Sequence, residues 1–130
     1  MTDSLASPRA YTRIDQLLPY EQELVAVRRH LHQNPELAFG EHATSDFIAD
    51  RLAEWGDEVT RGIGGTGLVG TLRQGDGARS LGIRADMDAL PIQEATGAAH
   101  ASCVPGLMHA CGHDGHMTML LGAAKYLARQ

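Results

Sequence analysis

Apolar residues recur at intervals of three to four positions in three stretches of the chain, which places them on one face of an α-helix. The first stretch predicts a helix over residues 19–32, ended by Asn34-Pro35. The second predicts an amphipathic helix over residues 41–55, with Gly56 as its C-terminal cap. The third begins at Met117, directly after a polar segment, and predicts a helix that continues towards the end of the sequence.

Between the second and third helices the pattern changes to short runs that are typical of β-strands. We expect strands at residues 58–61, 68–72 and 80–87. The glycine-rich segment 62–67 predicts a hairpin-like turn, since it matches neither the Walker pattern nor the dinucleotide fingerprint. After Pro91 comes a long loop with little periodicity. The order of these elements predicts an α/β fold, a layered sheet with flanking helices.

Composition narrows the class of protein. The 130 residues carry a formal net charge of −5, which argues against nucleic acid or an anionic membrane as a partner. No apolar run approaches the roughly 20 residues of a membrane helix, and the start lacks the features of a secretory signal. We therefore expect a cytoplasmic protein whose two cysteines, Cys103 and Cys111, are free thiols or metal ligands. Residues 1–18 are expected to be a flexible segment before a single domain at 19–130.

The segment from Met108 to His116 concentrates residues that can bind metal. His109, Cys111, His113, Asp114 and His116 fall within eight positions. Cys111 and His113 stand two residues apart, so in an extended loop both side chains point to the same side. A cysteine thiolate favours zinc, cobalt or nickel over magnesium. The alternative is a buried cysteine beside a hydrogen-bonded core histidine, but the neighbouring ligand types favour a metal site.

A second candidate lies at the end of the third predicted strand. Asp86 and Asp88 share one face, where two carboxylates repel each other unless a cation or a donor lies between them. The alternative is a solvated pair, or Asp86 paired with Arg84. Several other residues carry weaker signals: His30, His32 and His42 are expected to be polar groups at helix ends, and His100 and Cys103 have no assigned role.

Taken in order, these motifs resemble a known family. The matching segments are Arg28–His32, Asn34–Leu37, Gly64–Gly67, Ile83–Pro91 and Met108–His116. The chain is similar to the metal-dependent amidohydrolases that include hippurate hydrolase, N-acyl-amino-acid amidohydrolase and the auxin-conjugate hydrolases. These belong to the aminoacylase and carboxypeptidase group of dinuclear metallopeptidases.

The resemblance implies a site for two divalent ions (zinc, manganese, cobalt or nickel) that hydrolyses the amide of a small N-acyl amino acid. It makes Cys111 and His113 two of the metal ligands and Asp88 the aspartate that supports catalysis. Asp86 stands where relatives in the wider group carry a ligand histidine. The implied glutamate pair has no match here, since neither Glu41 nor Glu94 fits its motif.

We therefore expect residues 19–130 to be the N-terminal part of the catalytic domain of such an enzyme. The helix pattern continues to Gln130 without a cap, so the chain reads as a fragment with at most a partial metal site and no activity alone. The later ligands and a lid domain, through which the full enzyme could form a homodimer, would lie beyond it. Two alternatives stay open: a non-catalytic metal-binding or interaction module of the same fold, and a cysteine hydrolase that uses Cys111 with His113 or His116.

Overall fold

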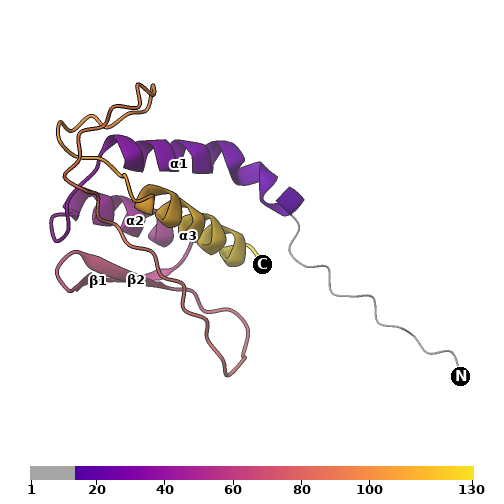
Figure 1. The fold of residues 1–130 in the computed structure, drawn as a ribbon. Coiled ribbons are helices and arrows are strands. Elements are labelled where there is room, and N and C mark those ends of the chain that lie inside the picture. Colours follow the sequence, from indigo (N-terminus) through magenta and orange to yellow (C-terminus); the bar gives the residue numbers. More distant parts are fainter. Residues whose placement is uncertain (1–13) are drawn as a thin grey trace, which may run out of the picture.

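A computed structural model describes residues 14–130, in which three helices lie beside a two-stranded sheet (Figure 1). Two short 3-10 turns, η1 (Ile14–Gln16) and η2 (Leu18–Tyr20), precede the first long helix. Most of the predicted flexible segment, residues 1–13, lies outside the described part of the chain. Of the helices in the described part, none is long and apolar enough to cross a membrane.

The helix predictions are confirmed to within a few residues. Helix α1 spans Glu21–Gln33 and α2 spans His42–Glu54. The chain leaves α1 at Asn34, because the proline that follows disfavours helical backbone there. Helix α3 spans His113–Ala128 and thus begins four residues before Met117, where the apolar pattern starts. The first turn of α3 is therefore made from the polar, ligand-rich segment itself.

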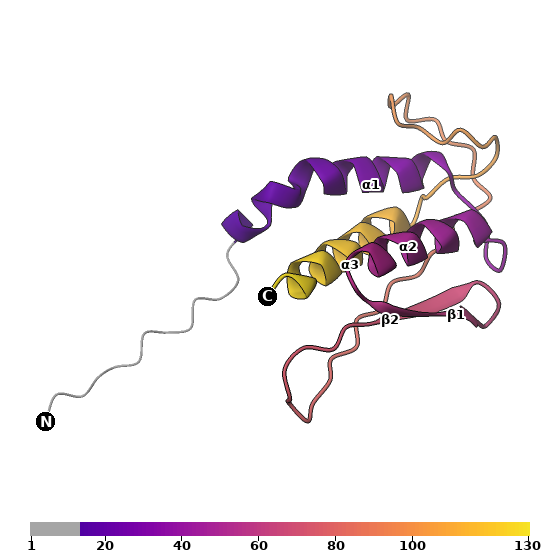
Figure 2. The ribbon, with the colours of Figure 1, turned by 180° about the vertical axis from the view of Figure 1, so that it is seen from behind.

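The glycine-rich turn joins two antiparallel strands, as predicted. Strand β1 (Glu58–Ile63) pairs with β2 (Gly67–Thr71), with Thr60 opposite Val69. Gly67 is required by space, since a Cβ atom there would lie 2.4 Å from the main-chain oxygen of Ile63. The hairpin packs against one side of α2, and Figure 2 shows the same arrangement from behind.

The predicted strand at residues 80–87 is wrong. No strand among residues 14–130 is hydrogen-bonded to this segment, and alternating side chains cannot supply a hydrogen-bonding partner. Alternation puts Leu81, Ala85 and Met87 on one face of this segment, and of these Ala85 and Met87 pack against the core whereas Leu81 is 81% exposed. Isolated bridges fix the end of the segment, from Ala89 to Leu37 and from Leu90 to Met108.

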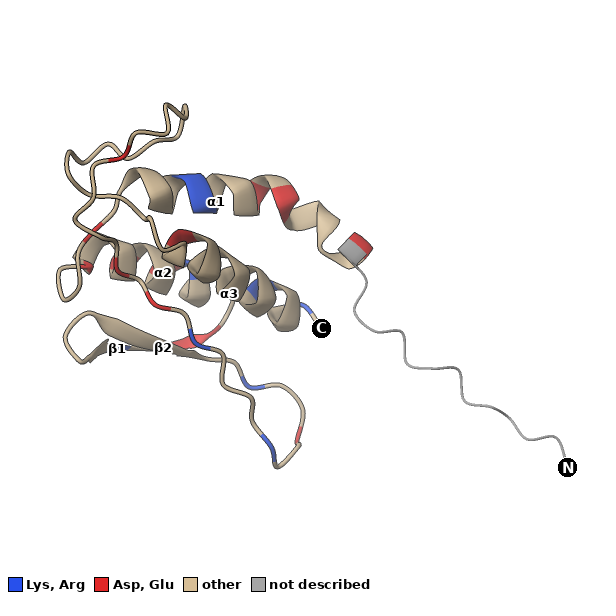
Figure 3. Cartoon of the chain, viewed as in Figure 1, with Lys and Arg blue, Asp and Glu red and all other residues tan. Residues whose placement is uncertain are grey.

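The core lies between the three helices. Its buried side chains come from all of them, and they are Val27, Leu31, Ile48, Leu52, Met117 and Leu121. Gly122 of α3 allows close packing, since a Cβ atom there would lie 3.1 Å from the Leu24 side chain of α1. Figure 3 shows acidic positions at the start of α1 and basic positions farther along, which is favourable for the helix dipole. The core thus fixes α3 against α1 from Met117 onwards.

Candidate metal-binding site

The candidate ligands lie where the chain turns into α3. Gly112 precedes the helix in a left-handed conformation (φ 90°), which lets the loop enter the helix directly. Cys111 stands just before this glycine and is an exposed, free thiol. His113 is the first residue of the helix. The sharp turn therefore places a thiol and an imidazole on either side of one glycine, at a helix N-terminus that favours negative charge.

Asp88 orients the His113 ring. The His113 Nδ1 atom lies 2.9 Å from the main-chain oxygen of Asp88 and 3.0 Å from its Oδ1 atom. With Nδ1 donating a proton to these acceptors, Nε2 keeps a lone pair and is free to bind a metal ion. Carboxylate partners commonly hold ligand histidines in this way. Asp88 itself is held in place because the next residue, Ala89, donates its N–H to Glu36 O at 2.8 Å.

The residues present fit part of a metal site. The structure brings Asp88 and His113 together and places Cys111 on the adjoining turn, all with donor types that zinc, cobalt and nickel accept. Within residues 14–130, however, no group of three or more His, Cys, Asp and Glu side chains is close enough to hold an ion. The donor types of Cys111 and His113 are thus compatible with a partial metal site, and the described residues bring no third ligand within reach of both.

Asp86 does not join this arrangement. Its Oδ1 atom lies 2.6 Å from an Arg84 amino group, and both side chains are well exposed. The two aspartates of the segment thus separate, one towards His113 and the other towards a neighbouring arginine in solvent. An exposed pair of this kind contributes little to stability.

A buried polar cluster lies directly behind the ligand turn, and sequence reasoning missed it. Asp114 is 1% exposed and its Oδ2 atom accepts from His32 Nδ1 at 2.8 Å and from Arg28 Nε at 3.0 Å. The other ring nitrogen of His32 lies 3.0 Å from Glu94 Oε1. His32 had been predicted to be a polar group at a helix end. A usable signal existed, because Arg28 and His32 are four residues apart and so share one helix face.

The hydrogen bonds of this cluster shift the pKa values of its titratable groups. Burial lowers the pKa of His32, but the hydrogen bonds to Glu94 and Asp114 outweigh it and raise the pKa above its usual value. Burial alone would raise the pKa of Asp114, yet its bonds to His32 and Gly115 N–H and the nearby Arg28 lower it. The Ser102 N–H, the Thr96 hydroxyl and His32 lower the pKa of Glu94 to about 2. These shifts all favour the charged forms of His32, Asp114 and Glu94.

Among residues 14–130, none of His100, Cys103, His109 and His116 forms a hydrogen bond with the Asp88–His113 pair. His109 is buried, and neither of its ring nitrogens has a hydrogen-bond partner within residues 14–130; burial lowers its pKa. His116 is exposed, with its ring centroid 5.8 Å from that of His113. His100 makes an edge contact with His32, and Cys103 is exposed and free.

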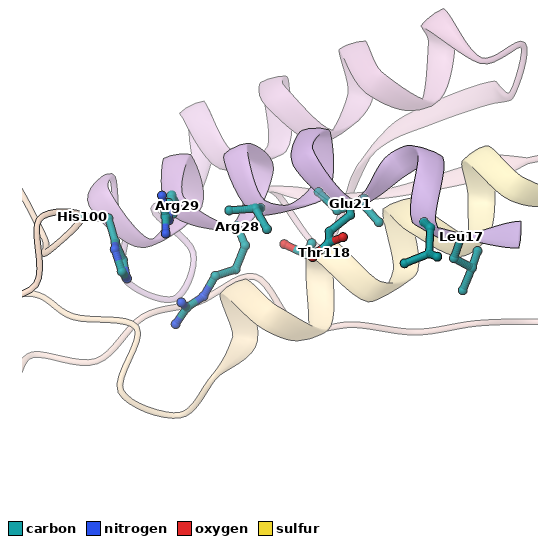
Figure 4. A pocket seen from close by; sticks show the side chains of 9 residues that line it. Leu17, Glu21, Arg28, Arg29, His100 and Thr118 are labelled. Carbon is teal, nitrogen blue, oxygen red and sulfur yellow. The ribbon is translucent and has the colours of Figure 1, made fainter. Parts of the chain in front are cut away.

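A surface groove of about 580 Å³ runs along α1 (Figure 4). Arg28, Arg29 and His100 lie at one end and Leu17 at the other, with Glu21 and Thr118 between them. None of Asp88, Cys111 and His113 lines it. The groove is therefore separate from the candidate ligands and does not define the metal site.

Comparisons with known proteins show which family the chain resembles. Residues 82–130 match the family described as Peptidase family M20/M25/M40. Hippurate hydrolase from Campylobacter jejuni is 50% identical over 117 residues, which cover 90% of this chain and 30% of the relative. An IAA-amino acid hydrolase of Arabidopsis thaliana (ILR1-like 5) is 48% identical over 104 residues, 80% of this chain and 24% of the relative.

A solved structure is similar in fold as well as in sequence. The YXEP protein of Bacillus subtilis, described as a dinuclear metal-binding peptidase of the M20 family, superposes with a TM-score of 0.81 at 37% identity. The match covers 86% of this chain and 32% of that one. The chain thus spans about a third or less of the length of the proteins it matches.

Proposed function

Residues 82–130 belong to peptidase family M20/M25/M40, and from this premise we propose that residues 19–130 form the metal-binding part of a metal-dependent amidohydrolase. One observation carries the proposal most directly. Asp88 holds the Nδ1 side of His113, which leaves Nε2 free on the turn that also presents the Cys111 thiol. An oriented imidazole beside an accessible thiol is a donor set suited to zinc, cobalt or nickel, and manganese remains a candidate by family.

The substrate class follows from the relatives. Their names refer to hippurate and to conjugates between IAA and amino acids, so we propose the amide bond of a small N-acyl amino acid as the bond cleaved. Two divalent ions, when bound in the whole enzyme, would polarise the amide carbonyl and activate water. The roles of this chain's own residues are narrower. Cys111 and His113 bind, and Asp88 fixes the tautomer and direction of the His113 ring.

Catalysis needs more groups than residues 14–130 bring together. Taking a proton from the attacking water requires a base within hydrogen-bond reach. Glu94, one of the two carboxylates of the buried cluster, is already bonded to three donors. We therefore propose that the chain binds metal through a partial site and does not turn over substrate alone. A homodimer of the whole enzyme and a cytoplasmic location remain part of this proposal; two free thiols favour the latter.

Metal binding by the purified chain tests the proposal. Cobalt is the best probe, because a bound thiolate gives a charge-transfer absorption that solvated cobalt lacks. We expect about one ion per chain, with the absorption lost in Cys111→Ser and in His113→Asn. The matched controls are Cys103→Ser and His42→Asn, which change exposed residues outside the turn.

Two results would contradict the proposal. If Cys103→Ser removed the absorption as fully as Cys111→Ser, the ion would not be bound at the predicted turn. If the chain hydrolysed hippurate in a metal-dependent manner, the proposed lack of turnover would be wrong. The chain could instead bind metal stoichiometrically and show no hydrolysis even when mixed with the remaining part of a relative's chain. That result would favour a non-catalytic module of the same fold.

A further inference from the structure

The buried cluster behind the ligand turn joins three segments that are far apart in sequence. His32 lies near the end of α1, Asp114 in the first turn of α3, and Glu94 in the loop after Pro91. The His32 side chain is only 6% exposed, and each of its ring nitrogens contacts a carboxylate from a different segment. It is the single side chain that touches both acidic groups among the described residues.

The chemistry of these contacts is directional. Ionised carboxylates only accept hydrogen bonds, so an imidazole shared between two of them donates through both nitrogens. Such charge-assisted bonds are shorter and stronger than neutral ones. Arg28 adds a second cation on Asp114, at 3.0 Å. Two cations and two carboxylates thus compensate one another, which is the condition for keeping charges buried.

Each bond of His32 fixes a different element. Through Nδ1 it holds Asp114, whose side chain also accepts from the Gly115 N–H and so belongs to the first turn of α3. The residue before Asp114 is His113, the proposed ligand. Through Nε2 it holds Glu94, which gathers the loop by accepting from Thr96 and Ser102. The loop is also bonded to α1, because the Cys103 N–H donates to Gln33 O at 2.9 Å. In Figure 1 the loop lies beside the end of α1.

We propose that His32 is a positioning residue for the metal site and acts through Asp114. It sets the direction in which the first turn of α3 presents His113 and Cys111, while its bond to Glu94 holds the neighbouring loop in place. This inference rests on the proposed function, because it takes Cys111 and His113 as the ligands. Helix packing alone does not fix this direction, since the core contacts of α3 begin at Met117.

The two bonds can be separated by substitution. An asparagine amide nitrogen occupies nearly the place of the histidine Nδ1 atom, and a glutamine amide nitrogen that of Nε2. His32→Asn therefore keeps the donor to Asp114 and loses the one to Glu94, whereas His32→Gln does the reverse. Both variants are neutral and similar in size, so they form a matched pair. His30→Gln, at an exposed position of the same helix, is the control.

Two measurements on the whole chain test whether His32 positions the metal site. In the metal-free protein, nitrogen NMR of His113 reports whether its Nδ1 proton is still held by Asp88. With cobalt, titration gives the affinity and the absorption spectrum gives the ligand geometry. Outer-shell partners of metal ligands typically contribute about 10- to 100-fold in affinity. We expect His32→Gln to lose about that much, with an altered spectrum and a weakened His113 bond, and His32→Asn to stay within about threefold of the unmodified chain.

The opposite outcomes are distinguishable. Equal losses in both variants, in proportion to their loss of unfolding free energy, would show that His32 is merely structural. An unchanged His113 resonance and affinity in His32→Gln, in a chain whose cobalt absorption depends on Cys111, would overturn the positioning role and leave the proposed function intact. Cobalt absorption that does not depend on Cys111 or His113 would overturn the proposed function, and the positioning role with it.

Discussion

Replacing Asp88 by asparagine tests the orientation of His113 most directly. The His113 Nδ1 proton is shared between two acceptors of Asp88, the main-chain oxygen at 2.9 Å and Oδ1 at 3.0 Å. Asp88→Asn keeps the main-chain acceptor and replaces the carboxylate oxygen with an amide oxygen. What is lost is the negative charge that raises the basicity of the ring and fixes its tautomer.

The magnitude follows from this partial loss. Removing an outer-shell partner costs about 10- to 100-fold in metal affinity, and here one acceptor remains. We therefore expect the lower limit, about tenfold weaker binding of zinc, which corresponds to about 1.4 kcal/mol. Competition against a chromophoric chelator measures the dissociation constant. Circular dichroism of the apo protein shows whether the fold is retained.

Asp86→Asn is the matched control. It changes the same residue type two positions earlier in the same segment, where Asp86 pairs with Arg84 rather than with His113. It should leave zinc affinity unchanged. If Asp86→Asn weakened binding as much as Asp88→Asn, the effect would be one of overall charge and the orientation argument would be refuted. Complete loss of binding in Asp88→Asn would instead show that Asp88 contacts the ion itself.

Three further predictions concern stability. The pKa of His32 is raised above 6.5 in the folded chain, so its contribution to the unfolding free energy is present below pH 6.5 and is lost as pH rises through the raised value. Denaturant titrations should show the unfolding free energy falling over that pH range, and His32→Gln should flatten this dependence. Leu121→Ala should cost about 2–5 kcal/mol, since Leu121 is fully buried in the core, while Leu127→Ala, at a residue 41% exposed, should cost much less; similar midpoint shifts would contradict this packing. Gly112→Ala should destabilise the chain by about 1–2 kcal/mol because of its left-handed backbone, whereas Gly115→Ala, which meets open space inside a helix, should not; thermal unfolding separates the two.

Periodicity predicted the three helices and the hairpin, but it was wrong for residues 80–87, for a physical reason. A helix closes its hydrogen bonds within its own sequence, so the apolar spacing in Leu24, Val27 and Leu31 carries enough information to place α1. A strand takes its hydrogen bonds from another segment. The alternation over residues 80–87 predicted which side chains turn inwards near Met87, but it could not predict whether a neighbouring strand is present.

The site divides in the same way. Cys111 and His113 were predicted as ligands because ligand types crowd one short segment, and Asp88 was predicted as a site residue because it belongs to a recognisable motif. The cluster of His32, Asp114 and Glu94 was missed because Glu94 and Asp114 lie 62 and 82 positions after His32 along the chain. Nothing in the spacing of one helix indicates which carboxylates will meet its last turn. Only the shared face of Arg28 and His32 hinted at a common partner.

The long loop after Pro91 shows what takes the place of periodicity. Its sequence shows little periodicity, so no apolar pattern indicates what holds it in place. In the structure its order comes from polar anchors: Glu94 collects the Thr96 hydroxyl, the Ser102 N–H and His32, and the loop's main chain is bonded to Gln33. One carboxylate that accepts several hydrogen bonds can stabilise an irregular segment where no helix or sheet ladder is available. Because the same carboxylate contacts His32, the loop and the ligand turn of α3 are held by one side chain, and a change in either segment should be felt by the other.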